Sequence, residues 1–384
     1  MKSPTLLRLR LPVALVKLMD VQLVKSKLVF ETGKIFAGNC FTILQNCSGE
    51  LVFNTAMSGY QEIITDPSYC GQMVCMTYPH IGNTGINPED MEGKRPYMSA
   101  MLMKDYQPVP SNWRATESLK SYLDKNELVG ISDLDTRAIT RYVREQGAMR
   151  AVIVPATVSD EDAIAQAKKS EGVVGKDWVM TVTTKDHYVY PSVGEAKYRV
   201  AVLDCGVKTN ILRQLAGLNC ELFVYPANTP AQTVLDRNVD GVFISNGPGD
   251  PATLGYAIDF IKGVLGKKPL FGICLGHQLL GLAVGLKTYK LKFGHHGANH
   301  PIQNLFTGKI EITSQNHGFN VEEPTAQHGG ISVTHRNLND HTVAGIADVK
   351  NKAFSVQYHP EAAPGPHDSN YLFHDFIRLI EESR

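Results

Sequence analysis

Apolar residues in the second half of the chain follow two alternating patterns. Short runs expected to form strands occur at 199–203, 222–225, 242–245, 270–274, 309–313 and 353–357. Segments in which apolar residues recur at helical spacing are 211–218, 257–265, 275–284 and 373–380. Strands that alternate with helices form βαβ units, so this half is expected to be an α/β domain with a doubly wound, mostly parallel sheet. The chemistry of such sheets lies beyond the carboxyl ends of the strands.

The first half of the chain has a mixed pattern. Short strands are predicted at 27–30, 34–37 and 50–54. Asp135 caps the start of a predicted helix that Gly147 ends, and Ser159 opens another short helix. These segments predict a separate N-terminal domain of mixed α/β type.

The stretch 172–196 keeps no sustained periodicity and separates the two patterns. The predicted organisation is a tail or targeting segment at 1–22, an N-terminal domain at 23–171, a linker at 172–196 and the α/β domain at 197–384. The first segment is basic with an apolar centre, which fits either a targeting segment or a disordered tail, with Met19 as an alternative start.

Composition and charge exclude several classes of partner. Lys plus Arg number 38 and so do Asp plus Glu, so no net field attracts nucleic acid or an anionic membrane, and neither is expected to bind. The seven cysteines are scattered without a C-x-x-C pair, which argues against a disulfide framework or a structural zinc site. This cysteine usage indicates a reducing compartment, and we expect a cytoplasmic protein. No apolar run approaches the roughly 20 residues that span a bilayer.

Cys274 is the candidate nucleophile. It stands at the centre of a G-x-C-x-G pattern, Gly272 to Gly276, where a predicted strand runs directly into a predicted helix. The two glycines leave room for the sharp turn of a nucleophile elbow, and the helix N-terminus favours a thiolate. The N–H of Leu275 is then placed to stabilise an oxyanion. The alternative interpretation is a structural cysteine buried at a strand end.

A glycine-rich loop follows another predicted strand, at 244–251. Gly247 and Gly249 can present backbone N–H groups to a ligand, and such a loop could complete the oxyanion hole. No Lys-Ser or Lys-Thr follows it, so it is not a phosphate-binding P-loop. The alternative is an ordinary tight turn.

His359 is the candidate base. It follows the predicted strand 353–357, and Glu361 is placed two residues on to hold the imidazole in one tautomer. The alternative is a loop histidine beside a surface carboxylate. Three further histidines fit no standard metal-ligand spacing, so no metal site is expected. They are His295, His296 and His300.

These features together resemble the class I glutamine amidotransferases over 197–384. Other segments are similar to the small subunit of carbamoyl-phosphate synthetases. They are 53–62, 65–69, 133–137, 208–213, 293–297 and 364–368. The second resemblance runs from about residue 26 to the end of the chain. It implies that Cys274 is the nucleophile of a triad with His359 and Glu361.

The resemblance also implies ligands and partners. The residues implied to contact L-glutamine are Ser68, Gly247, Gly249, Leu275, Gln278, Asn316, Gly318 and Phe319. Ser68 belongs to the N-terminal domain, so glutamine is expected between the domains, and the Asn316 side chain suits its polar ends. No cofactor is expected in this chain. ATP, Mg²⁺ and bicarbonate are implied for a longer large subunit, which forms a heterodimer with the small one and receives ammonia through a tunnel.

The product of such a complex, carbamoyl phosphate, serves pyrimidine biosynthesis, arginine biosynthesis or both. Three other functions stay open. They are a cysteine peptidase or other hydrolase on the same fold, a non-catalytic regulatory subunit, and the amidotransferase half of another synthase. The intact set of Cys274, His359 and Glu361 argues against the second, and the N-terminal segments argue against the third.

Overall fold

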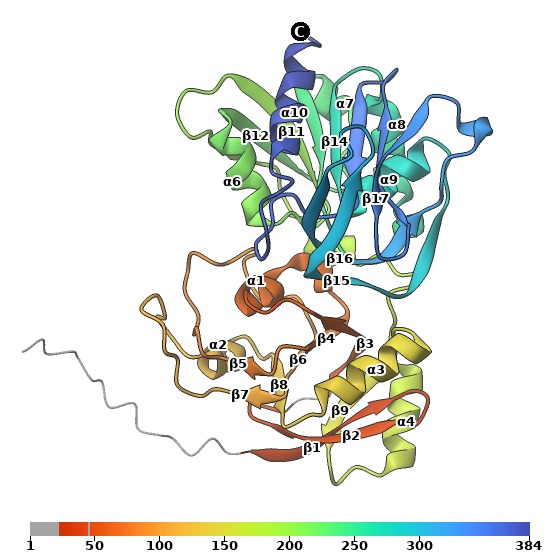
Figure 1. Ribbon diagram of the computed structural model, residues 1–384. Helices are drawn as coiled ribbons and strands as arrows, with labels where there is room; N and C mark the ends of the chain where they lie inside the picture. Colours follow the sequence, from red (N-terminus) through yellow and green to blue (C-terminus); the bar gives the residue numbers. More distant parts are fainter. Residues whose placement is uncertain (1–22, 45–46) are drawn as a thin grey trace, which may run out of the picture.

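The structure, a computed structural model, describes residues 23–44 and 47–384. The tail or targeting segment predicted at 1–22 lies outside the described residues. The first half of the sequence forms one lobe and the second half forms another (Figure 1). The lobes meet near α1 (Tyr60–Thr65) of the first and β15 (Thr288–Asn304) of the second.

The N-terminal lobe is built on a closed barrel. Its strands, in order around the barrel, are β1 (Val24–Phe30), β2 (Ile35–Cys40), β8 (Val129–Ser132), β6 (Ala100–Leu102), β4 (Gln72–Met76), β3 (Cys47–Asn54) and β9 (Met149–Pro155). The pairs β3–β4, β4–β6 and β6–β8 are parallel, and the other pairs are antiparallel. Leu28, Leu51 and Met73 belong to one buried cluster, because alternate side chains of each strand point to the same face.

Short elements surround this barrel. They are η1 (Pro67–Tyr69), β5 (His80–Ile81), β7 (Asp105–Tyr106), α2 (Leu119–Lys125), α3 (Thr136–Gln146) and α4 (Asp160–Lys169). Asp135 accepts a hydrogen bond from the Ala138 N–H at the start of α3. Ser159 accepts one from the Asp162 N–H at the start of α4. Both predicted helix starts are therefore confirmed, and Gly147 ends α3 with a φ of 102°.

The C-terminal lobe is built on a ten-stranded sheet. Its strands, in spatial order, are β10 (Tyr188–Tyr190), β12 (Cys220–Pro226), β11 (Tyr198–Asp204), β13 (Gly241–Ile244), β14 (Leu270–Ile273), β19 (Ala353–Val356), β18 (Val343–Asp348), β17 (Ile331–Asn337), β15 and β16 (Ile310–Val321). The central strands from β12 to β19 are parallel, which confirms the predicted doubly wound core.

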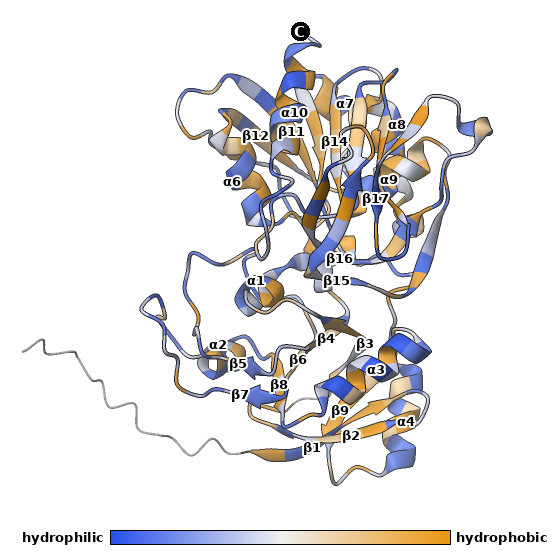
Figure 2. Cartoon of the chain, viewed as in Figure 1, coloured by the Kyte–Doolittle hydropathy of each residue, from blue (hydrophilic) through white to orange (hydrophobic). Residues whose placement is uncertain are grey.

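Helices cover both faces of the parallel core. They are α6 (Thr209–Gly217) and α10 (Tyr371–Glu381) on one face, and α7 (Ala231–Leu235), α8 (Gly255–Val264) and α9 (Leu275–Ala283) on the other. Val200 and Val202 pack with α6 and α10, whereas Ala201 and Leu203 pack with α8 and α9. The apolar central strands between these layers appear in orange in Figure 2. Within the described residues, no helix combines the length and the apolar character needed to cross a membrane.

The sheet extends beyond the parallel pattern that the sequence predicted. Strands β18, β17, β15 and β16 continue it in antiparallel pairs, and β15 and β16 form a long, irregular hairpin. The stretch 172–196, expected to be a linker, contains α5 (Val179–Val182) and the edge strand β10. Most residues of β10 and β15 are only half-buried or exposed, so the apolar residues of these two strands show no clean period.

The packing around Phe271 predicts a large loss of stability on truncation. This side chain is fully buried and stacks on Phe354, with ring centroids 4.4 Å apart. Phe271→Ala leaves a cavity in the parallel core and should lower the free energy of unfolding of this lobe by about 3–5 kcal/mol. Urea denaturation followed by circular dichroism measures the change. Phe306→Ala, which alters a side chain that is 74% exposed, is the control and should leave the midpoint unchanged. Equal midpoints for the two variants would contradict the packing described.

Candidate active site

Cys274 lies where β14 ends and α9 begins. Its backbone has φ 54° and ψ −103°, which a non-glycine residue adopts only when its surroundings hold it there. The Cys274 N–H donates to Val356 O of β19 (2.9 Å), which anchors the turn. A Cβ on Gly276 would come 2.3 Å from Ile244 O, so the turn has no room for a side chain at that position. The G-x-C-x-G segment therefore forms the sharp strand–helix turn that its pattern predicts.

Free backbone donors surround the Cys274 thiol. The side chain is buried, and Sγ lies 3.4 Å from Asn316 O. The N–H of Leu275, the first residue of α9, donates to no acceptor in the described part of the chain. The same holds for the N–H groups of Gly247 and Gly249, and both glycines line one cavity with Cys274. Unpaired N–H groups beside a nucleophile are what an oxyanion hole requires.

His359 and Glu361 form a buried pair at the end of β19. The His359 N–H donates to Ser314 O of β16 (2.9 Å), which fixes the backbone of the base. His359 Nδ1 lies 2.7 Å from Glu361 Oε1, so Nε2 is the ring nitrogen that can exchange a proton with the nucleophile or the substrate. Nε2 has no hydrogen-bond partner among the described residues, although the Cys274 sulfur is close enough to affect the charge of the ring. A hydrogen bond between a nucleophile and its base often forms or shortens only when substrate is bound.

Neighbouring charges set the protonation of this pair. Burial disfavours the imidazolium, but Glu361 and then Cys274 outweigh it and raise the pKa of His359 to about 10. Burial also disfavours the Glu361 carboxylate, but Lys208 and then His359 outweigh it and lower the pKa of Glu361 to about 2. At neutral pH the pair is therefore an imidazolium beside a carboxylate.

Lys208 belongs to this site, although no sequence pattern singled it out. It precedes α6 and is buried, with Nζ 3.0 Å from Glu361 Oε1 and 2.6 Å from Ala362 O. In the sequence it stands only within the segment 208–213 that resembles the small subunits. Its partner lies far along the chain, so nothing in the local pattern distinguishes it from a surface lysine.

A small cavity beside Cys274 is lined by residues of both lobes. They are Ser68, Gln72, Val173, Gly247, Gly249, Cys274, Gln278, Asn316, His317, Gly318 and Phe319. Seven of the eight residues implied to contact glutamine are in this set, and Leu275 is the exception. Sequence reasoning missed Gln72, Val173 and His317 because none of them stands in a motif with a chemical meaning. The structure thus gathers the implied substrate residues around the thiol.

Polar contacts lock the two lobes together at this cavity. Asn246 Nδ2 donates to Ser68 Oγ (2.9 Å), and Asn316 Nδ2 donates to Asp66 Oδ2 (2.9 Å). The other end of the Asn316 amide, Oδ1, lies 2.9 Å from His296 Nδ1. Each end of the amide thus has one partner within the protein, and the second Nδ2 hydrogen and a lone pair of Oδ1 remain for the predicted contact with glutamine.

The clustered histidines have partners inside the fold. His295 Nε2 lies 2.7 Å from Asp340 Oδ2, and its ring packs on His300. Burial lowers the pKa of His296 to about 3 and that of His300 to about 4, so both are neutral. Across residues 23–44 and 47–384, no group of three or more His, Cys, Asp or Glu side chains could hold a metal ion.

Comparison with known proteins gives a match for each lobe. Residues 201–379 match the family model described as "Glutamine amidotransferase class-I". Residues 28–153 match the one described as "Carbamoyl-phosphate synthase small chain, CPSase domain".

Single relatives match across both lobes. The chain is 50% identical to the carbamoyl phosphate synthase small chain of Syntrophotalea carbinolica and 51% identical to that of Chlorobaculum tepidum. Each alignment covers 94% of this chain and 99% of the relative. The carbamoyl phosphate synthase pyrimidine-specific small chain of Halalkalibacterium halodurans is 47% identical, over 94% of this chain and 98% of the relative.

The tight packing of the glycine loop predicts a sharp loss of activity. A Cβ on Gly247 would lie 2.1 Å from Cys205 O, a backbone atom, so Gly247→Ala must displace the loop and its N–H groups. The loss of one oxyanion donor costs on the order of 10²–10³ in rate, and we expect kcat for glutamine hydrolysis to fall by about that factor. Glutamate release measures it. Gly255→Ala adds a methyl with nothing within 4 Å and should behave as wild type. Wild-type kcat in Gly247→Ala would exclude the loop from the reaction.

Proposed function

Because this chain belongs to the family of carbamoyl phosphate synthase small chains, the glutamine amidotransferase subunits of these synthases, we propose a specific reaction for it. It hydrolyses L-glutamine through a thioester on Cys274 and delivers ammonia to a large synthetase chain. That chain combines ammonia with bicarbonate at the expense of ATP. The observation that carries the proposal is a strained, buried Cys274 next to the His359–Glu361 pair, in a cavity that both lobes line.

The first half of the reaction forms the thioester. The Cys274 thiolate attacks the side-chain carbonyl carbon of glutamine, and the carbonyl oxygen becomes an oxyanion. The N–H groups of Leu275 and of the 247–249 loop stabilise this charge. The C–N bond then breaks, and His359, held protonated by Glu361, gives its proton to the leaving nitrogen, which departs as ammonia.

The second half releases glutamate. His359, now neutral, takes a proton from water, and the resulting hydroxide attacks the thioester carbon. The same donors stabilise the second oxyanion. When it collapses, the C–S bond breaks, glutamate leaves, and the thiolate beside the imidazolium is restored.

The shape of the cavity favours a free amino acid over a peptide. It is small, and Ser68 and Gln72 of the N-terminal lobe line it together with Cys274. A peptidase needs a groove through which an extended chain can enter and leave. The cavity therefore supports glutamine hydrolysis over the peptidase alternative.

A second small cavity adjoins the first, and we propose it as the start of the path that ammonia takes away from the nucleophile. It shares Asn316 with the first cavity and is lined by His359, the residue that protonates the leaving group. Asn54 and Ala56 of the N-terminal lobe and Pro364 of the C-terminal lobe complete its wall. Ammonia would thus leave the thiol between the two lobes.

Removal of the nucleophile separates glutamine-dependent from ammonia-dependent synthesis. In the complex with the large chain, Cys274→Ala should lower carbamoyl phosphate formation from glutamine by about 10³-fold or more, because no thioester forms. Synthesis from added ammonium should persist, since that chemistry belongs to the large chain. Cys220→Ala, which alters a buried cysteine of β12, is the matched control and should keep both activities. Loss of both activities in Cys274→Ala would show a structural fault instead.

The pair of His359 and Glu361 predicts a pH effect. The imidazolium is the acid of the first step, and Glu361 raises the pKa of His359 to about 10, so activity should persist until the pH approaches that value. Glu361→Gln removes this charge and lowers the pKa of His359, so the alkaline fall of kcat should move to lower pH. The pH profile of glutamate release measures it. Glu323→Gln, at an exposed carboxylate paired with Arg336, should leave the profile unchanged. If the alkaline fall of kcat in Glu361→Gln came at the same pH as in the wild type, Glu361 would not set the pKa of His359 in the reaction.

A further inference from the structure

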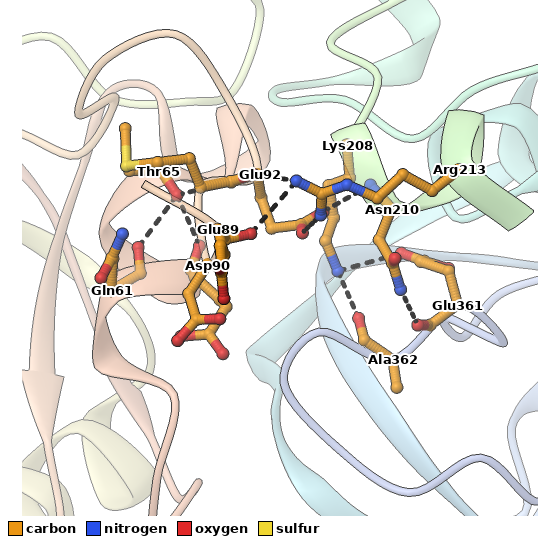
Figure 3. Close-up of polar contacts among 12 residues, drawn as sticks. Gln61, Thr65, Glu89, Asp90, Glu92, Lys208, Asn210, Arg213, Glu361 and Ala362 are labelled. Atoms are coloured by element: carbon orange, nitrogen blue, oxygen red, sulfur yellow. Dashed lines mark hydrogen bonds and ion pairs between the residues drawn. The ribbon is translucent and has the colours of Figure 1, made fainter. Parts of the chain in front are cut away.

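A buried carboxylate of the N-terminal lobe reaches into the C-terminal lobe. Glu92 lies in the loop between β5 and β6, and its side chain is 1% exposed. Its Oε2 accepts a hydrogen bond from the Asn210 N–H (2.9 Å), and its carbonyl oxygen accepts one from the Thr209 N–H (3.0 Å). Its Oε1 accepts a third, from Arg213 Nη1 (3.3 Å). Figure 3 shows Glu92 facing Asn210 and Arg213 across the boundary of the lobes.

Glu92 supplies the cap that α6 lacks. Lys208, the residue before the helix, makes no side-chain hydrogen bond to the first turn. The first N–H groups of a helix have no acceptor within it, and a negative charge is favoured at that end. Glu92 satisfies two of these groups from another lobe. Its own N–H donates to Thr65 Oγ1 (2.9 Å), which ties it to α1.

The same turn of α6 holds Glu361. Lys208 Nζ lies 3.0 Å from Glu361 Oε1 and donates to Ala362 O (2.6 Å). Asn210 Nδ2 donates to Glu361 O (2.6 Å). Figure 3 shows Lys208 and Asn210 both pointing toward Glu361 and Ala362. The backbone that Glu92 fixes therefore carries the two side chains that fix Glu361.

Charge reinforces this arrangement. Burial lowers the pKa of Lys208, but Glu361, then Glu92 and Asp66, outweigh it and raise that pKa above its usual value. Glu92 thus helps to keep the buried ammonium charged and paired with Glu361. Burial raises the pKa of Glu92 to about 7, and Glu361 adds to this rise, whereas Lys208, Asn210 and Arg213 oppose it without cancelling it.

We infer that Glu92 is a positioning residue for the His359–Glu361 pair, through which the N-terminal lobe controls the rate of glutamine hydrolysis. The inference rests on the proposed function and extends it to a residue that touches neither the substrate nor the thiol. A misplacement of about 1 Å in an active site can cost about 10²-fold in rate. A loosened Glu361 should therefore lower kcat. KM should stay near its wild-type value, since Glu92 does not line the glutamine cavity.

A double-mutant cycle in the full chain tests the inference, with steady-state hydrolysis of L-glutamine as the readout. Glu92→Gln keeps the size of the side chain but loses its charge and one acceptor. We expect kcat to fall about tenfold and KM to change by less than about twofold. In the Glu361→Gln background, adding Glu92→Gln should lower kcat by less than about twofold, because the residue acts through Glu361.

A neighbouring carboxylate, the folded state of each variant and a charge-retaining substitution serve as controls. Glu89→Gln changes an exposed carboxylate of the same loop, paired with Arg114, and should behave as wild type. Thermal unfolding of each variant shows whether the protein is folded, and Glu92→Asp, which retains the charge, should recover part of the lost kcat. Equal fold-losses in both backgrounds, or wild-type kcat in Glu92→Gln, would overturn the inference alone. A wild-type chain that hydrolyses no glutamine would overturn the proposed function and the inference with it.

Discussion

Glu361 has no exposed side-chain surface, so its negative charge has to be balanced by partners inside the protein. Two cations do this, with His359 Nδ1 at 2.7 Å and Lys208 Nζ at 3.0 Å. The first follows the end of β19, and the second precedes α6, a helix that covers one face of the sheet. The buried ion cluster thus ties the candidate base to the helix layer, and the position of the base depends on both.

The same cluster explains why two lobes meet at one site. Glu92 and Asp66 of the N-terminal lobe both lie near enough to Lys208 to raise its pKa, and Asp66 also accepts a hydrogen bond from Asn316 beside the thiol. The cavity next to Cys274 is lined from both sides of this boundary. A barrel domain and a doubly wound domain therefore form one functional unit, because charged and polar groups of each satisfy groups of the other.

Local patterns predicted the features that depend on neighbours in sequence. The period of apolar residues predicted the parallel core, and Asp135 and Ser159 marked helix starts that the structure confirms. The barrel and the antiparallel half of the sheet were not predicted. Their pairing joins segments far apart in the chain, as in the β1–β9 and β15–β17 pairs. Pairing between distant strands leaves little trace in a local hydrophobic pattern.

The sequence by itself determined the turn at Cys274, because the two glycines and the strand–helix junction act within five residues. It also determined the neighbourhood of His359 and Glu361, since two residues on one loop cannot lie far apart. Only the tertiary structure decided which distant groups complete the site. Lys208 is buried, Glu92 caps a helix of the other lobe, and the Asn316 amide is engaged by Asp66 and His296. Burial and contacts with distant residues set the charge and the orientation of such side chains, and neighbouring residues in the sequence predict neither.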